Sequence, residues 1–403
     1  MLIKEQFHFK QYILILLAIV FFQGTSCFIF DGGYFGVIGR MSFQERFIYT
    51  TSNVLGFCYY PRNVLFATTL LLQRDINRSQ MKKKSISDQS LITYSLNLKP
   101  LEDPLLYYSK VYKKSNVTRI PLITHRVWIT SNESPIELTN FLREQLLQNL
   151  NKTYYNLDSS AAQRGLNWTH YLWIQDKSLL PETVQLFQSY GVVVKELKDL
   201  KLFDEKTKFQ FDFYLQDFKA AAAASDLMRG VVVAEHGGIY FDNDFKIDEW
   251  DYNINYLFDY YGISLYLWAA RFTLNGFFAA KKGHPIVVHY MEQMKDSFSL
   301  IEEERPHYMN ECIFKTTAMI MFGTGPSVLG ATAYNFINQD GNQDYIVFEY
   351  NEMSETQTTM IDENGEEKPV TIKLNGRDGY SASWLNDFRD YSKFGWSDLN
   401  QFN

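Results

Sequence analysis

Cysteine and proline are scarce in this chain. Its 403 residues include 3 Cys and 10 Pro. Cys27, Cys58 and Cys312 are too few for a disulfide framework, and their spacing is not that of a zinc site. A Cys58–Cys312 disulfide and a pair of buried free thiols both fit the sequence. The sequence therefore favours neither a disulfide-stapled scaffold nor a zinc-bound domain.

Positive charge is scarce as well. The formal net charge is −7, and the basic residues form no stripe beyond Lys82-Lys83-Lys84. Proteins that bind nucleic acid show a basic patch or stripe, so we expect no nucleic-acid partner. Hydrophobic residues make up 46% of the chain and charged residues 21%, which is typical of a globular protein with a large core.

Long hydrophobic runs are missing except near the N-terminus. Lys4 and Lys10 precede an uncharged apolar segment at residues 12–22, and small or polar residues follow. This is the layout of a signal peptide. The segment is shorter than the about 20 residues of a membrane span, although residues 27–30 extend its apolar character. We therefore expect residues 1–26 to be a signal peptide or a signal anchor, with membrane association in the second case.

Potential glycosylation sites also favour entry into the secretory pathway. Asn-x-Ser/Thr sequons occur at Asn77, Asn116, Asn132, Asn151 and Asn167. Each is common by chance, but with the N-terminal segment they favour a glycoprotein of the eukaryotic secretory pathway. We expect the Golgi lumen or membrane as the location, with secretion as the alternative.

The most informative chemistry lies in the middle of the chain. Five alanines at 220–224 favour a helix, on which Asp226 and Arg229 share a face because they are three residues apart. Gly237 stands where a helix needs a left-handed residue to end. Residues 239–241 are a β-favouring run. The sequence therefore predicts a helix, a glycine stop and a strand in direct succession.

Two carboxylates follow that strand. If the strand continues through Asp242 and Asp244, their side chains point the same way, with Cα atoms about 6.6 Å apart. Carboxylates are hard oxygen ligands that suit Mn²⁺ or Mg²⁺, and such a cation neutralises a diphosphate at the strand end of an α/β sheet. A solvated acidic turn is the alternative, because Asp-x-Asp alone is weak evidence. In its context, the pair predicts a metal-held diphosphate.

Ser-Asp-x-x-Arg at 225–229 and Gly-Gly-x-Tyr-x-Asp-x-Asp at 237–244 resemble the sugar-binding region of the DXD-containing glycosyltransferases. That family includes yeast initiating mannosyltransferases, animal α-1,4-galactosyltransferases and, more distantly, the glucosylating clostridial toxins. Three further segments match in order, at 120–129, 275–285 and 324–326. The resemblance spans roughly residues 120–390.

The resemblance implies a GT-A-type fold, an α/β fold that binds nucleotide sugars. It implies a metal-dependent glycosyltransferase that retains anomeric configuration and moves a sugar from a UDP- or GDP-sugar donor to a glycan, lipid or protein acceptor. Asp226 and Arg229 would bind hydroxyls of the donor sugar. Arg229 would also help stabilise oxygens that gain charge in the reaction.

The other site residues implied by the resemblance lie on both sides of this region. Asp244 would bind the metal directly, and Asp242 would hold the ribose or sugar and reach the metal through water. Trp128 would stack on the nucleobase, while Tyr240 would line the pocket. Asp176 also falls at a strand end that could face the nucleotide, although a solvated loop is the better interpretation of that residue.

A late segment matches the family less well. Many relatives close a Ser-Trp segment over the donor, and Ser383 and Trp384 are the candidates here, with Asp378 as a further carboxylate. The histidines that precede this segment in many eukaryotic relatives are absent. An ordinary loop with one packed Trp explains the residues equally well.

The chain divides into three parts. Residues 27–115 match no motif, so we expect a stem or accessory lobe between the N-terminal segment and a catalytic domain at 116–403. In the catalytic domain, strand-like and helix-like segments alternate, which favours a mostly parallel central sheet with helices on both faces. The predicted strands are 122–130, 171–174 and 192–194, and the predicted helices are 136–150 and 183–190.

Two details of this secondary structure concern the termini of elements. The helix at 136–150 is expected to be capped near Ser134, with Glu137 three residues on. Residues 352–368 are expected to form a surface loop, with a hairpin around Asn364-Gly365. His284 is expected to fix a turn before Pro285.

Other functions remain open from the sequence. A glycoside hydrolase would place an acid and a base about 5 to 9 Å apart across the scissile bond, whereas adjacent carboxylates suit chelation better. A non-catalytic protein with a degenerate site is opposed by the complete set of expected donor-site residues. A secreted, toxin-like effector that glycosylates a host protein is compatible with the motif.

Overall fold

A computed structural model describes residues 111–217, 219–267, 270–304, 319–336, 343–347 and 353–377. The N-terminal segment at 1–26 and nearly all of the expected stem at 27–115 lie outside these ranges. Several individual predictions also fall outside them, and these concern Cys27, Cys58, Cys312, Asp378, Ser383 and Trp384. Within the described ranges, no helix combines the length and apolar character needed to cross a membrane.

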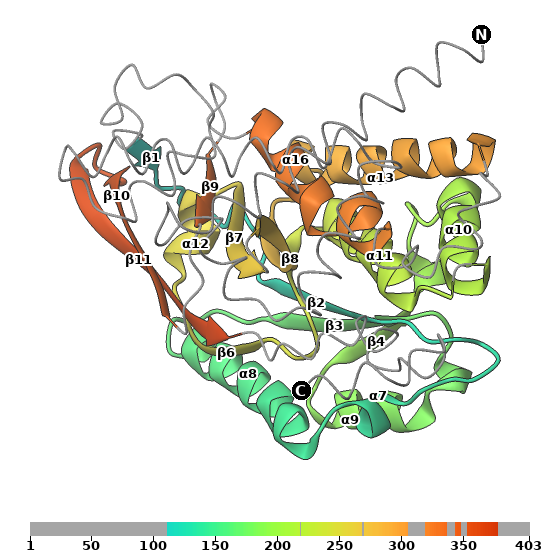
Figure 1. The fold of residues 1–403 in the computed structure, drawn as a ribbon. Helices are drawn as coiled ribbons and strands as arrows, with labels where there is room; N and C mark the ends of the chain where they lie inside the picture. The colour runs from blue at the N-terminus through green and yellow to red at the C-terminus, as the bar shows by residue number, and fades with distance from the viewer. Residues whose placement is uncertain are drawn as a thin grey trace, which may run out of the picture.

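The main sheet has seven strands in the order β4-β3-β2-β5-β8-β7-β9 (Figure 1). Their bounds are β2 Ile123–Trp128, β3 Thr169–Ile174, β4 Val193–Glu196, β5 Gly238–Phe241, β7 Tyr260–Leu267, β8 Ala270–Ala280 and β9 Asp344–Val347. The run β4, β3, β2, β5 is parallel, β8 is antiparallel to both neighbours, and β9 is parallel to β7. The predicted mostly parallel sheet is confirmed, and the three predicted strands correspond to β2, β3 and β4.

The strand order reverses beside β2. Strands β3 and β4 are added on one side of it, whereas β5 pairs on the other. In open α/β sheets, ligands bind outside the carboxyl ends of the strands at such a switch point. The fold therefore directs attention to the residues that follow β2 and β5, which include the Asp-x-Asp motif.

Helices cover both faces of the sheet (Figure 1). Their bounds are α7 Leu138–Phe141, α8 Glu144–Ala162, α9 Pro181–Ser189, α10 Glu205–Asp212, α11 Ala221–His236, α12 Asn253–Leu257, α13 Pro285–Glu304 and α16 Pro326–Phe336. Side chains of α11, α13 and α16 form one buried cluster with β2, β5 and β8. Those of α7, α8 and α9 form another with β3 and β4. The prediction of helices on both faces is thus confirmed.

Helix α11 is buried along most of its length. Most of its apolar residues, including Ala223, Leu227 and Val231, have no exposed surface. The alanines at its start allow the close approach of neighbouring elements. The helix ends at Gly237, whose φ of +69° is in the region that favours glycine, and the chain turns directly into β5. The predicted helix, glycine stop and strand are all present.

A second sheet of four strands was not predicted. It has the order β1-β10-β11-β6, with β1 Val111–Lys113, β6 Lys246–Trp250, β10 Met353–Ile361 and β11 Glu367–Arg377. The expected surface loop at 352–368 is wrong, because β10 and β11 occupy most of it. The hairpin expected around Asn364-Gly365 is present, with Gly365 at φ +83°. Strands β10 and β11 lack a strong local strand signal. They form because they pair with β1 and β6, which are distant in the sequence.

The predicted helix at 136–150 is also wrong in part. The chain breaks between α7 and α8, where Leu142 and Arg143 are extended. Glu137 does not cap its own helix. Its carboxylate accepts hydrogen bonds from the N–H of Thr183 (2.8 Å) and the N–H of Glu182 (3.1 Å) at the start of α9. Glu137 therefore caps the start of α9 and not its own helix, and the local sequence does not reveal this partner.

Candidate active site

The two aspartates of the motif lie in a turn, not in a strand. Strand β5 ends at Phe241, and the N–H of Phe245 donates to the carbonyl of Asp242 at 3.0 Å. The expectation that Asp242 and Asp244 project from one continuous strand is therefore wrong. A four-residue turn places both side chains at the carboxyl end of β5, at the edge where the strand order reverses. We call residues 242–245 the DXD turn.

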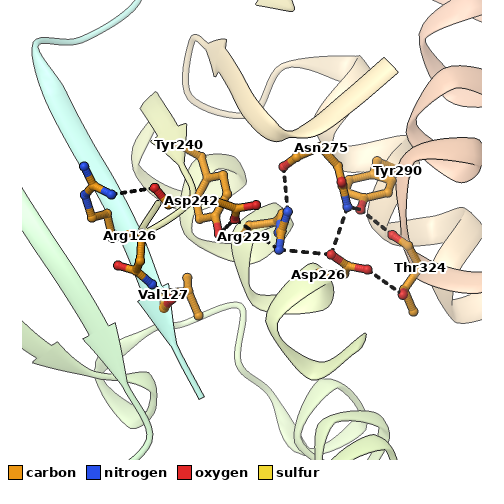
Figure 2. Close-up of polar contacts among 10 residues, drawn as sticks. Arg126, Val127, Asp226, Arg229, Tyr240, Asp242, Asn275, Tyr290 and Thr324 are labelled. Carbon is orange, nitrogen blue, oxygen red and sulfur yellow. Dashed lines mark hydrogen bonds and ion pairs between the residues drawn. The ribbon is translucent and has the colours of Figure 1, made fainter. Parts of the chain in front are cut away.

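A buried ionic cluster joins α11 to this turn (Figure 2). The Nη2 atom of Arg229 lies 3.1 Å from Asp226 Oδ1 and 3.3 Å from Asp242 Oδ1. The hydroxyl of Tyr240 donates to Asp242 Oδ1 at 2.6 Å, and the Arg229 guanidinium lies 4.8 Å from the centre of the Tyr240 ring. Four of the predicted site residues are thus in direct contact.

Three residues without a predicted role hold Asp226 in place. Asn275 of β8 donates to Asp226 Oδ1 at 2.8 Å, and Thr324 donates to Oδ2 at 2.8 Å. Tyr290 of α13 donates to the carbonyl of Thr324. The Nη1 of Arg229 donates to the carbonyl of Asn275 at 2.8 Å. Both Asn275 and Thr324 lie in segments that resemble the family, at 275–285 and 324–326, but no role is predicted for either residue from the sequence.

Burial and charge shift the titration of this cluster. Burial raises the pKa of Asp226 to about 6, against the opposing effects of the Arg229 charge and the Thr324 hydrogen bond. Burial also raises the pKa of Asp242, and Arg229 again opposes the shift. Burial acts to lower the pKa of Arg229, but the charge of Asp242 and its neighbours outweighs it and raises that pKa. The guanidinium is therefore charged, and Asp226 titrates close to neutral pH.

Strand β2 holds the DXD turn from the other side. Arg126 donates from Nη1 to the carbonyl of Asp242 at 2.5 Å and from Nη2 to that of Phe245 at 3.2 Å. Asn243 donates to the carbonyl of Val127 at 2.8 Å. The turn is thus tied to the centre of the sheet and to α11 at once.

The carboxylate of Asp242 has room for a ligand-binding role only because its neighbour on β8 is glycine. A Cβ atom at Gly276 would come 2.7 Å from Asp242 Oδ2, which is closer than a nonbonded contact permits. The Asp242 side chain is one-third exposed (33%), unlike that of Asp226 (4%). Asp242 is therefore the more accessible of the two carboxylates.

The donor set at the turn fits a hard divalent cation shared with a phosphate. Asp242 and Asp244 supply carboxylate oxygens within one turn, and both are half-buried. In the described ranges, no group of three or more His, Cys, Asp or Glu residues is arranged to bind a metal. Mg²⁺ is commonly held by one or two carboxylates with water and substrate phosphates completing its shell. Two aspartates therefore suffice for that kind of site, but not for a closed structural one.

Trp128 and Asp176 do not belong to the ionic cluster. The indole N–H of Trp128 donates to the carbonyl of Ile136 at 2.9 Å, and the ring packs against Phe141 with centres 4.9 Å apart. The tryptophan is half-buried at the carboxyl end of β2. Asp176 is exposed and accepts from the N–H of Ser178 at 2.7 Å, so it caps a short 3₁₀ turn in a solvated loop.

A family comparison agrees with this geometry. Residues 135–261 match the family described as glycosyltransferase sugar-binding region containing DXD motif. The chain carries a DXD glycosyltransferase region. The match includes α11, β5 and the DXD turn, so the residues that form the ionic cluster lie inside it, apart from the supporting residues of β8 and beyond. Residues 135–261 therefore form a glycosyltransferase sugar-binding region within an α/β fold.

Solved structures resemble the chain only loosely. "PaToxG Glycosyltransferase" shares 15% identity and covers 66% of this chain and 80% of its own, with a TM-score of 0.39. The UDP-bound glycosyltransferase domain from the YGT toxin shares 12% identity and covers 56% of this chain and 79% of its own, with a TM-score of 0.37. No curated protein matches the chain significantly in sequence. Similarities this low do not transfer residue roles.

Proposed function

We propose that this glycosyltransferase is metal-dependent, retains anomeric configuration and uses a UDP- or GDP-sugar as donor. The observation that carries the proposal is the Arg229 bridge between Asp226 and Asp242. Through this bridge, the pair that we propose binds the sugar, Asp226 and Arg229, contacts the turn that we propose binds the metal. In a nucleotide sugar the sugar is attached directly to the diphosphate. One donor molecule can therefore contact the proposed sugar-binding pair and the proposed metal-binding turn together.

In this proposal Asp242 and Asp244 hold Mn²⁺ or Mg²⁺. Asp244 would bind the cation directly, and Asp242 would reach it through water and contact the ribose or sugar. When bound, the cation neutralises the leaving diphosphate, which takes the place of a protein acid. Arg229 supplies a fixed positive charge beside the reacting oxygens, and burial strengthens that interaction because little water screens it.

The remaining predicted residues take supporting roles. Trp128 is half-buried beside Val127, which accepts a hydrogen bond from the DXD turn, so we propose that its ring stacks on the nucleobase. Tyr240 lines the sugar pocket and orients Asp242 through its hydroxyl. Burial raises the pKa of Tyr240 well above its ordinary value, so the hydroxyl stays protonated and acts as a donor.

Ser383 and Trp384 are proposed to close over the donor. Strand β11 supports this, because it ends at Arg377, which pairs with Lys246 of β6. Lys246 lies two residues after Asp244 in the chain. The chain therefore leaves β11 beside the DXD turn, only a few residues before the Ser-Trp segment. Asp378 follows Arg377 in the sequence and is proposed as a further carboxylate.

A glycoside hydrolase is less consistent with the geometry. That reaction places two carboxyl groups on opposite sides of the scissile bond. Asp226 and Asp242 instead share one guanidinium on the same side of the site. A bond to be cleaved has no room between two carboxylates that the same arginine bridges.

The acceptor is proposed to be a glycan, a lipid or a protein in the secretory pathway, in the Golgi or outside the cell. The asparagine side chains of the four sequons in the described ranges, at Asn116, Asn132, Asn151 and Asn167, are exposed, as glycosylation requires. Expression in a secretory cell line followed by glycosidase treatment tests this part. A mobility shift supports lumenal passage, whereas unmodified cytosolic protein contradicts it.

The donor and the metal are tested together by thermal unfolding. A ligand that binds only the folded state raises the melting temperature. At a free ligand concentration of 100 times Kd, it adds about 2.7 kcal/mol to the free energy of unfolding. We expect one nucleotide sugar of a UDP and GDP panel to raise the melting temperature with Mn²⁺, and the rise to vanish with EDTA. Equal shifts with and without metal would contradict the proposal.

Asp244→Asn tests the metal ligand itself. We expect donor hydrolysis or transfer to fall by at least about a hundredfold, because a lost metal ligand removes the charge that carries the diphosphate. The melting temperature without ligand should change little. Asp248→Asn is the matched control, because it removes the same charge from an exposed position on β6 and should keep full activity.

A further inference from the structure

Arg126 is a charged residue in the centre of a buried strand. It lies in β2, between β3 and β5, and its side chain has no exposed surface. Burying a charge is costly unless it is paired or fully hydrogen-bonded. An apolar residue would fill the same space in the core without that cost. The arginine therefore has a use beyond packing.

The guanidinium is aimed at the backbone of the DXD turn. It donates to the carbonyls of Asp242 and Phe245, which are the first and last residues of the turn. The guanidinium carbon Cζ lies 4.2 Å from the centre of the Phe241 ring, and this contact helps to fix the plane of the guanidinium. Because Arg has rigid, planar donors, two bonds set both the position and the orientation of the turn.

Asn243 makes a second link to the same strand. Its amide donates to the carbonyl of Val127, the residue after Arg126. The turn is thus attached to β2 by three hydrogen bonds that involve both the first and the last residue and one between them. Strand β2 is paired on both sides within the sheet, so it is a rigid support.

The two arginines of the site act from opposite sides. Figure 2 shows Arg126 and Arg229 on either side of Asp242, with Arg126 directed to its backbone and Arg229 to its side chain. The Arg126 charge is also close enough to Asp242 and Asp244 to affect their electrostatics. It offsets part of the repulsion between two carboxylates that sit in one turn.

We propose that Arg126 is a positioning residue for the metal: it fixes the DXD turn so that both aspartates are ready to bind the cation. The inference rests on the proposed metal dependence. It concerns a residue that touches neither the sugar nor the cation, and it acts through the two backbone carbonyls.

Two effects of Arg126 oppose each other, and this makes the idea testable. Its charge repels a cation, so loss of charge alone would tighten metal binding. Its hydrogen bonds preorganise the ligands, so their loss weakens metal binding. Arg126→Met removes both, while Arg126→Lys keeps the charge and loses the fork. Partners that orient metal ligands typically contribute 10- to 100-fold in affinity, so we expect positioning to dominate.

The experiment measures Mn²⁺ affinity without donor, by electron paramagnetic resonance of the free ion. We expect the apparent Kd to rise about 10- to 100-fold in both Arg126→Met and Arg126→Lys. With donor present, KM for Mn²⁺ should rise by a similar factor, while kcat at saturating Mn²⁺ stays within a few-fold. An unchanged or lower Kd in the Met variant would overturn the inference.

Two further variants separate positioning from general loss of stability. Asn243→Ala removes one link without emptying a buried charge site, and we expect its Kd for Mn²⁺ to rise several-fold. Arg119→Met breaks the partly exposed pair with Asp259, and its Kd should match the unmodified protein. Wild-type Kd values in Asn243→Ala and Arg126→Lys contradict the inference alone. An unmodified protein that binds no Mn²⁺ contradicts the proposed function as well.

Discussion

Asp226 shows how much of the site depends on single side chains. It is a carboxylate on a helix whose other buried residues are mostly apolar, and it is stable there because Arg229, Asn275 and Thr324 all bind it. The i, i+3 spacing of Asp226 and Arg229 was visible in the sequence, and the predicted shared face is confirmed. The other two partners come from distant segments, which no local pattern connects to Asp226.

Thr324→Val should shift the pH dependence of activity. Asp226 must be charged to accept from Arg229 and from a sugar hydroxyl, so activity should rise with pH through its pKa of about 6. The Thr324 hydrogen bond lowers that pKa, and its loss should move the acid limb of kcat/KM upward by roughly one pH unit. An unshifted limb in the valine variant would contradict this assignment.

The same group affects stability in the opposite direction. Its folded pKa of about 6 lies above the ordinary value of 3.8, so the folded protein binds more protons than the unfolded chain between these pH values. The free energy of unfolding contributed by Asp226 therefore falls as pH rises from about 4 to about 6. Activity and stability thus respond to this carboxyl group with opposite signs.

At the scale of elements, the join between α11 and β5 decides where the site lies. The sequence predicted it well because a glycine pair, an alanine run and a β-favouring run coincide. The prediction was wrong one residue later, where the strand ends and the DXD turn begins. A turn held by Arg126 and closed by Phe245 cannot be read from the alternation of side chains along a strand.

Gly237→Ala should be strongly destabilising, and Gly165→Ala provides a matched control. Both glycines have φ +69°, where an alanine is strained. Gly237 also has ψ −172°, a conformation that only glycine adopts readily, which adds to the cost there. A Cβ atom at Gly237 would lie 2.6 Å from the backbone nitrogen of Lys282. A Cβ atom at Gly165 would have no such neighbour within 4 Å. We expect about 1 kcal/mol of destabilisation at Gly165 and at least about 3 kcal/mol at Gly237. Urea unfolding measures both, and equal losses would contradict the steric argument.

At the scale of the whole molecule, distant segments are tied together by buried polar contacts. His284 and Asp344 are both fully buried, and Nε2 of the histidine lies 2.7 Å from Oδ1 of the aspartate. The N–H of Ile286 donates to His284 Nδ1, which leaves Nε2 as the ring nitrogen in close contact with Asp344. This contact joins the start of α13 to the edge strand β9. The sequence had predicted a structural His284 before Pro285, and that prediction is confirmed.

His284→Leu should destabilise the fold by about 3 to 5 kcal/mol, because it leaves a buried carboxylate without the polar group that it contacts. The double variant His284→Leu with Asp344→Leu should lose less than the sum of the single variants, since neither partner is then stranded. Denaturant unfolding of the four proteins gives the coupling free energy. Strictly additive losses would show that the two residues act independently.

The sequence determined the chemistry of this protein. Helix propensity, the glycine stop and the Asp-x-Asp motif are local properties, and they predicted α11, β5 and the candidate metal-binding carboxylates. Tertiary structure decided how those groups are held. Arg126 on β2 hydrogen-bonds to the DXD turn, and Asn275 of β8 and Thr324 hydrogen-bond to Asp226. The second sheet is formed by three segments that are far apart in the sequence. Such contacts depend on side chains far apart in the chain, whose proximity is set by core packing and strand pairing.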